Sequence, residues 1–172
     1  MIRSTRPVSW IKAALREFET FPDGVRSICL TALTIAAEGG KADIAKPMRG
    51  LGSGDRHEKT EGDVAMKSEK LEVVKGSGNV FRDLGHKNAD VDLFKAILAA
   101  EIIKALDREG LSVRGAQGRT GIAAADFSRI RNADLGRFTV DRLMSIINRL
   151  GSRVEVKIKV RRAEAIEHGM RA

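Results

Sequence analysis

The segment from Ser112 to Ala133 constrains the fold of this chain more than any other part of its sequence. Ser112 is a residue type that caps helices, and helical composition continues from it to Thr120. Gly121 follows, and a second stretch with helical apolar spacing begins at Ala123. Because glycine tolerates a left-handed backbone, it turns the chain tightly between two short helices. The segment therefore predicts a helix, a tight turn and a second helix.

Helices are also expected on both sides of this segment. Apolar residues at i, i+4 spacing predict an amphipathic helix over 90–109, with Asp90 or Asp92 as its cap. Downstream, Thr139 caps a further stretch with apolar periodicity, and Gly151 ends it. Together with the two motif helices, these elements predict a domain of four to five helices.

A strand is expected at the end of this domain. The sequence "RVEVKIKVR" over 153–161 alternates strictly between apolar and charged residues, which is typical of a half-buried strand. A single strand needs a partner for its backbone, most simply its own copy in a dimer or a sheet edge on another protein. The pattern thus predicts a C-terminal β-strand and favours a homodimer.

The N-terminal part of the chain predicts an αα-hairpin. Apolar residues recur at helical spacing from Ser9 to Ala37, and "FPDG" interrupts them. Two helices of this length bury little surface alone, so they need something to pack against. The stretch "DRHEKTEGDVAMKSEK" follows the hairpin, is charged and has no period, which is typical of a linker.

These patterns predict a mainly α-helical fold in which a separate hairpin precedes the helix-turn-helix domain. They leave open whether the hairpin docks on that domain, dimerises or stays mobile. The expected boundaries are a hairpin over 1–54, a linker over 55–75, a helix-turn-helix domain over 76–162 and a tail over 163–172.

The charge of the chain predicts a polyanionic partner. Its formal net charge is +8, and residues 111–162 carry 12 Lys and Arg against four Asp and Glu. The whole basic excess therefore lies around the helix-turn-helix segment, which favours a local nucleic-acid footprint over a generally basic surface. No apolar run approaches the roughly 18 residues of a membrane span, so we expect a cytoplasmic protein that does not enter membranes.

Nothing in the sequence predicts catalysis, a metal or a cofactor. The single Cys29 excludes an internal disulfide and a cysteine-based zinc site, and the three histidines show no ligand spacing. The glycine-rich stretches over 50–55 and 76–81 lack the spacing of dinucleotide-binding and phosphate-binding loops. We therefore expect no enzyme.

The second motif helix carries the candidate base contacts. On a helical wheel Phe127, Ile130 and Ala123 face inward. The opposite face, margins included, carries Ala124, Ala125, Ser128, Arg129, Arg131 and Asn132. Alanine can contact a thymine methyl, asparagine can pair with adenine, arginine with guanine or a phosphate, and serine with a phosphate. The alternative is the solvated face of a helical domain that binds no DNA.

Arginines flank this face and are candidates for phosphate contacts. They are Arg114, Arg119, Arg137 and Arg142. The expected contacts are base contacts from Ala125, Ser128, Arg129 and Asn132, and backbone contacts from Arg114, Arg131 and Arg137. Each arginine has the alternative of being an ordinary surface residue.

The stretch from "LSVRGAQGRTGIAAADFSRIRNADLGRFTVDRLM" to "KIKV" resembles the Cro/C1-type (XRE family) helix-turn-helix of HigA-like antitoxins. "GSGNVFRDLG" resembles the segment that precedes their first helix, so the resemblance covers about residues 66–162. It implies a dimer that binds double-stranded operator DNA, represses its own operon and neutralises a toxin. Typical members have Gln at Val113 and polar residues at Ala124 and Ala125, so these contacts should differ here.

The first part, from "WIKAALREFETFPDG" to "GLGSG", is similar to the N-terminal hairpin of phage-derived HigB/RelE-superfamily toxins. Those toxins cleave messenger RNA with residues on a sheet that follows the hairpin. Here the charged stretch follows instead, so the resemblance implies a truncated toxin fragment fused to an antitoxin. Two alternatives stay open: a module that only sequesters a cognate HigB/RelE-type toxin, and a residual RNA-cleaving toxin.

Overall fold

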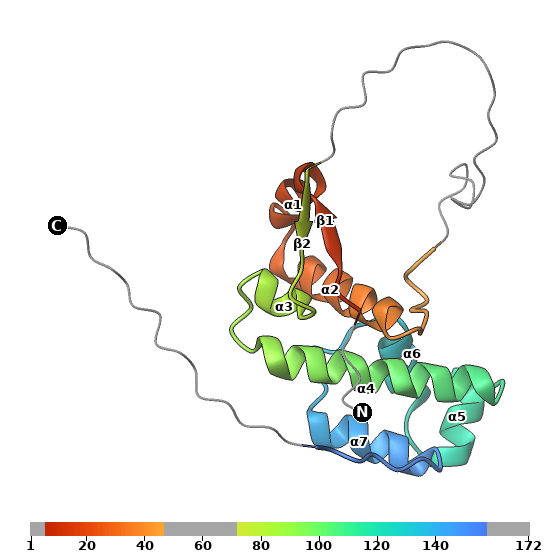
Figure 1. Cartoon of the computed structure of the whole chain (residues 1–172). Coiled ribbons are helices and arrows are strands. Elements are labelled where there is room, and N and C mark those ends of the chain that lie inside the picture. The colour runs from red at the N-terminus through yellow and green to blue at the C-terminus, as the bar shows by residue number, and fades with distance from the viewer. Residues whose placement is uncertain (1–5, 47–71, 158–172) are drawn as a thin grey trace, which may run out of the picture.

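Helix α4 (Ala89–Arg108) lies at the centre of the fold (Figure 1). The computed structural model describes residues 6–46 and 72–157, and there α2 (Asp23–Ala37) packs on one side of α4 and α7 (Val140–Arg149) on another. Helix α4 is apolar over much of its surface, so it can be covered by two helices, and its Ile102 and Ile103 are fully buried. The helix expected over 90–109 is confirmed.

The expected cap of α4 is wrong. Asn88 is the N-cap residue, and Asp90 and Asp92 lie inside the first turn. Asp90 accepts a hydrogen bond of 3.1 Å from the Asn79 side-chain amide and pairs with Arg82 (2.5 Å). This carboxylate is therefore used to hold the preceding segment against the start of α4, a tertiary role that local sequence does not show.

The helix, turn and helix expected around Gly121 are confirmed. Helix α5 (Val113–Thr120) begins after Ser112, whose hydroxyl accepts a hydrogen bond of 3.1 Å from the Gly115 N–H. Helix α6 (Ala124–Arg131) follows, and Thr139 caps α7 as expected. The described residues are thus mainly helical, with seven helices and one two-stranded sheet.

The expected hairpin forms, but it is not separate from the rest of the fold. Helix α2 packs against α4 and the short helix α3 (Val80–Asp83), and Phe18 of α1 (Lys12–Glu19) belongs to the same apolar cluster as residues of α2 and α3. Leu30 of α2 shares one apolar cluster with Phe81 of α3, and Ile35 belongs to the main core. Of the arrangements left open, the hairpin docks on the helical domain, because the apolar residues of α2 are buried in contact with those of α3 and α4.

A two-stranded sheet joins the N-terminal part of the chain to the segment before α3, and the sequence did not predict it. Strand β1 (Ser9–Ile11) pairs antiparallel with β2 (Val73–Lys75), with Trp10 opposite Val74 (Figure 1). Ser9 was expected to begin a helix, and residues 73–75 to end the linker. Residues 55–71 of that linker lie outside the described part of the chain.

Gly76→Ala is expected to weaken this sheet. A methyl group on Gly76 would lie 2.4 Å from the Val8 carbonyl oxygen, which accepts the Gly76 N–H, so the backbone must shift. We expect a loss of about 1–3 kcal/mol in the free energy of unfolding, measured by urea denaturation. Gly24→Ala is the control, because nothing lies within 4 Å of a methyl group there. Equal stability of both variants would contradict the prediction.

The expected C-terminal strand does not form within the described residues. Residues 152–157 run beside α4 and α7 without strand structure, and residues 158–172, including the expected tail, lie outside the description. Val154 contacts the core, but Val156 is 48% exposed. The reason is that no strand lies alongside this segment in the described chain to bond its backbone.

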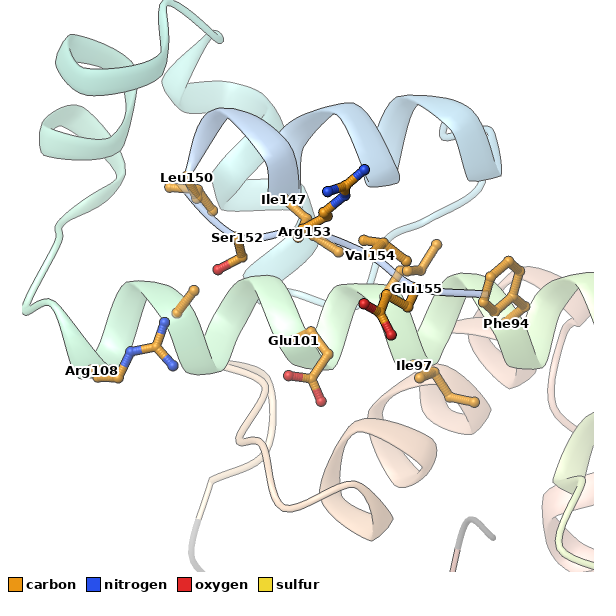
Figure 2. A pocket seen from close by; sticks show the side chains of 12 residues that line it. Phe94, Ile97, Glu101, Arg108, Ile147, Leu150, Ser152, Arg153, Val154 and Glu155 are labelled. Carbon is orange, nitrogen blue, oxygen red and sulfur yellow. The ribbon is translucent and has the colours of Figure 1, made fainter. Parts of the chain in front are cut away.

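A cleft of about 320 Å³ lies between this segment, α4 and the end of α7 (Figure 2). Its lining includes apolar Phe94 and Ile97 of α4 and the charged side chains of Glu101, Arg108 and Glu155.

Candidate nucleic-acid interface

The turn between α5 and α6 fixes the angle of the second motif helix. Gly121 has φ +73°, the left-handed conformation expected of it, and its N–H donates to the Gln117 carbonyl (2.8 Å). The buried Thr120 hydroxyl donates to the Ala116 carbonyl (2.7 Å) and accepts the Ile122 N–H (3.2 Å). The turn is therefore held by backbone and side-chain bonds together.

Gln117 contributes to the start of α6, and sequence reasoning missed it. Its side-chain oxygen accepts a hydrogen bond of 3.1 Å from the Ala124 N–H, one of the unpaired donors at the N-terminus of α6. Ala123, the N-cap residue, has no side chain that could do this. The only available signal was a glutamine on the preceding helix, close to the turn.

The inward face of α6 is largely as expected. Phe127 and Ile130 are fully buried in the main core. Ala123 was also expected to face inward, and this is wrong because it is exposed. Its backbone is not helical (φ −56°, ψ 135°), so a helical wheel does not give its direction.

The outward face of α6 brings four expected residues together. Ala125, Ser128 and Asn132 are exposed, and Arg129 is partly exposed on the same helix. The Asn132 amide donates to the Ser128 carbonyl (2.8 Å) at the end of α6. The margin residue Ala124 is half-buried. A contiguous row of small and polar side chains therefore lies along the helix.

The structure places Arg131 away from this row. Its guanidinium lies 2.8 Å from the Asp107 carboxylate of α4 and 3.7 Å from that of Asp43, and its side chain is only 15% exposed. The Asp43 N–H also donates to the Arg131 carbonyl (2.7 Å). Arg131 thus joins the end of α6 to the N-terminal part of the chain.

The flanking arginines differ in their surroundings. Arg114 of α5 and Arg137, between α6 and α7, are exposed. Arg119 pairs with Glu109, so much of its charge is compensated within the domain. Arg142 of α7 donates to the Asp126 carboxylate (2.5 Å), and Arg129 lies 3.6 Å from that same carboxylate. All four flanking arginines are exposed, but Arg119 and Arg142 each share their charge with a carboxylate.

Comparison with known protein families assigns this part of the chain. Residues 80–159 match a family model described as a helix-turn-helix domain. The chain contains a helix-turn-helix domain. The match includes α3 to α7, with the turn at Gly121 inside it, and indicates DNA-binding regulation. Neither the curated proteins nor the solved structures give a match to the chain.

The described residues contain neither a metal-binding cluster nor a membrane-spanning helix. Within residues 6–46 and 72–157, no group of three or more His, Cys, Asp or Glu side chains is placed to hold a metal ion. No helix in these ranges is both long and apolar enough to cross a membrane.

The residue that caps α7 lowers the pKa of an acidic group in the helix-turn-helix domain. The pKa of Asp141 lies below its ordinary value, chiefly because the Thr139 hydroxyl hydrogen-bonds to the carboxylate. Backbone N–H groups of Asp141 and Arg142 act in the same direction, and slight desolvation opposes them. Because the pKa of Asp141 is lower in the folded state than in the unfolded state, its ionised carboxylate stabilises the fold. This stabilisation is present above the ordinary pKa of about 3.9 and is lost as pH falls through the folded value.

Thr139→Ala is expected to raise the pKa of Asp141 towards its ordinary value and to lower the free energy of unfolding by about 1 kcal/mol through loss of the helix cap. An NMR titration of the Asp141 carboxyl and urea denaturation measure the two effects. Thr139→Ser keeps the hydroxyl and should preserve both. An unchanged titration of Asp141 in the alanine variant would contradict the assigned cause.

Proposed function

We propose that the chain is a sequence-specific DNA-binding transcriptional regulator of the antitoxin type. The observation that carries the proposal is the row formed by Ala125, Ser128, Arg129 and Asn132 on α6. This row lies on the second helix of a helix-turn-helix domain and within the basic part of the chain. The second helix of this motif is the one that enters a major groove.

The side chains of the row suit contacts to base edges and phosphates. Arg129 can pair with guanine, Asn132 with adenine, and the Ala125 methyl can contact thymine. Ala124 at the margin lets the start of α6 approach the bases closely. Arg114 and Arg137 are proposed to contact phosphates, whereas Arg131, which pairs with Asp107 and Asp43, is proposed to support α6 from behind.

The salt dependence of binding tests the DNA assignment. We expect the full chain to shift the DNA upstream of its own coding sequence, with log K falling against log salt at a slope of about −0.9 per phosphate neutralised. Arg129→Ala should weaken binding about tenfold or more, since a bidentate contact to guanine is lost. Absence of a shift at low salt, or an unaltered affinity for Arg129→Ala, would reject the assignment.

The proposed partner of the chain on DNA is a second copy of itself. Within the alternating sequence over 153–161, Val156 is 48% exposed and has an apolar side chain that a second copy would cover. Two such segments could pair as antiparallel strands and give a symmetric dimer for two half-sites. Light scattering should give twice the chain mass, and Val156→Pro should shift it towards the monomer.

The antitoxin role rests on the resemblance to HigA-like proteins, and the proposed site of action is the cytoplasm. We expect a HigB/RelE-type toxin encoded beside the gene to bind the full chain. If the chain only sequesters that toxin, Arg129→Ala will leave toxin binding unchanged and the full chain will not bind DNA. If the hairpin retained nuclease activity, expression of the full chain would cleave messenger RNA and arrest growth.

A further inference from the structure

A polar groove lies beside the outward face of α6. Its volume is about 290 Å³, and the turn before α6 and one side of α7 line it. The residues that matter for its chemistry are Asp126 of α6 and Arg142, Ser145 and Arg149 of α7. The three residues of α7 recur at i, i+3 and i+7, so they follow one side of that helix.

Positive charge exceeds negative charge at this groove. Arg142 donates to Asp126 (2.5 Å), and Arg149 donates to the Thr120 carbonyl (3.0 Å). Each guanidinium has five N–H donors, so each keeps donors beyond these bonds. Arg129 of α6 lies 3.6 Å from Asp126. Asp126 is therefore one carboxylate beside three guanidinium groups, those of Arg129, Arg142 and Arg149.

The side chains of Asp126 and Arg142 differ in their exposure to solvent, and therefore in their access to a ligand. The Asp126 side chain is 16% exposed, whereas that of Arg142 is 53% exposed. The carboxylate is therefore the more buried of the two groups, and the Arg142 side chain is open to solvent. A second anion can approach Arg142 from solvent while Asp126 remains bonded to it.

We propose that this groove binds one phosphate of the DNA backbone through Arg142 and Arg149, and that Asp126 competes with this phosphate for Arg142. The inference rests on the proposed DNA-binding function and adds a contact beyond the row on α6. Carboxylate and phosphate both present paired oxygens that match the fork of an arginine. Asp126 is thus a positioning residue that orders Arg142 before DNA arrives, which reduces the side-chain entropy lost on binding.

Two consequences separate this contact from those of the row. A phosphate contact carries no sequence information, so it strengthens binding to every duplex alike. It also releases counterions, so its loss lowers the salt slope. A purely structural role for the Arg142–Asp126 pair would change the thermal stability and leave the salt slope unaltered.

The test measures binding of the full chain to a labelled duplex of random sequence over a salt series. Arg142→Gln should weaken binding about tenfold and reduce the slope by about 0.9. Arg149→Gln should act in the same direction. Arg108→Gln removes an arginine that lines the other cleft, beside α4, and should change neither quantity beyond a small screened effect.

A double-mutant cycle tests the competition. Asp126→Asn should strengthen binding about threefold or more, and this gain should disappear in the Arg142→Gln background because the two groups act through one contact. Asp141→Asn removes an exposed carboxylate next to Arg142 in sequence, and its smaller effect should be equal in both backgrounds. Thermal melting of each variant establishes that it is folded.

The outcomes distinguish a failure of the proposed phosphate contact in the groove from a failure of the proposed DNA-binding function. If wild-type protein binds and Arg129→Ala weakens binding but Arg142→Gln leaves affinity and slope unchanged, the groove is rejected and DNA binding stands. If the gain of Asp126→Asn persists without Arg142, the competition is rejected. If the folded wild-type chain binds no duplex at low salt, both proposals fall.

Discussion

Ser128→Glu is expected to abolish specific DNA binding, with a loss of affinity of at least about 100-fold. Ser128 is exposed at the middle of the outward row of α6, between Ala125 and Asn132. A carboxylate there would face the phosphates and base-edge acceptors of a groove, and like charges that meet at an interface cost several kcal/mol. Each 1.4 kcal/mol corresponds to about a tenfold change in affinity.

The control places the same charge on α2, in the N-terminal part of the chain. Ala36→Glu adds a carboxylate to an exposed position of α2. It should leave DNA affinity within about a factor of two or three, because charges beyond a Debye length of about 8–10 Å are largely screened. Fluorescence anisotropy with the DNA upstream of the coding sequence measures both variants. Wild-type affinity in folded Ser128→Glu protein would remove α6 from the interface.

Phe127→Ala is expected to lower the free energy of unfolding by about 3–5 kcal/mol. Phe127 is fully buried on the inward face of α6, within the core that α4 and α7 share. Its truncation removes apolar contacts and leaves a cavity that a close-packed core fills only in part. Since small domains are stable by about 5–15 kcal/mol, this variant should lie near the limit of folding.

Urea denaturation followed by circular dichroism measures this loss. Ser128→Ala, at the next position, is the matched control and should change stability by no more than about 0.5 kcal/mol because its side chain is exposed. A loss below about 1 kcal/mol in Phe127→Ala would contradict the assignment of Phe127 to a tightly packed core.

The helices around the turn could be predicted because their signals are local. Ser112 and Thr139 are caps, Gly121 takes a left-handed conformation, and the apolar spacing of α4 follows the helical period. The sheet had no such signal. Its strands have three residues each and lie about 60 positions apart, so neither shows a measurable alternation.

Side-chain partners were the part of the candidate site that sequence could not give. Arg131 fitted the margin of the outward face by its position, yet Asp107, 24 positions away, and Asp43 hold it on the other side. The same is true of Asp126, whose two arginines come from α6 and α7. A helical wheel gives directions within one helix and contains no information on its neighbours.

The pairing of β1 with β2 has a consequence for synthesis on the ribosome. The Lys12 and Glu72 side chains that pair at the end of this sheet are 60 positions apart, and α2 packs on α4, which is later still. At roughly 5–20 residues per second, the apolar faces of α1 and α2 are made on the order of several seconds before their partners. Until then Leu30 and Ile35, fully buried in the finished fold, have no surface of α3 or α4 to cover them. The N-terminal part is therefore synthesised before the elements that cover it, and during that interval its apolar residues are open to a chaperone.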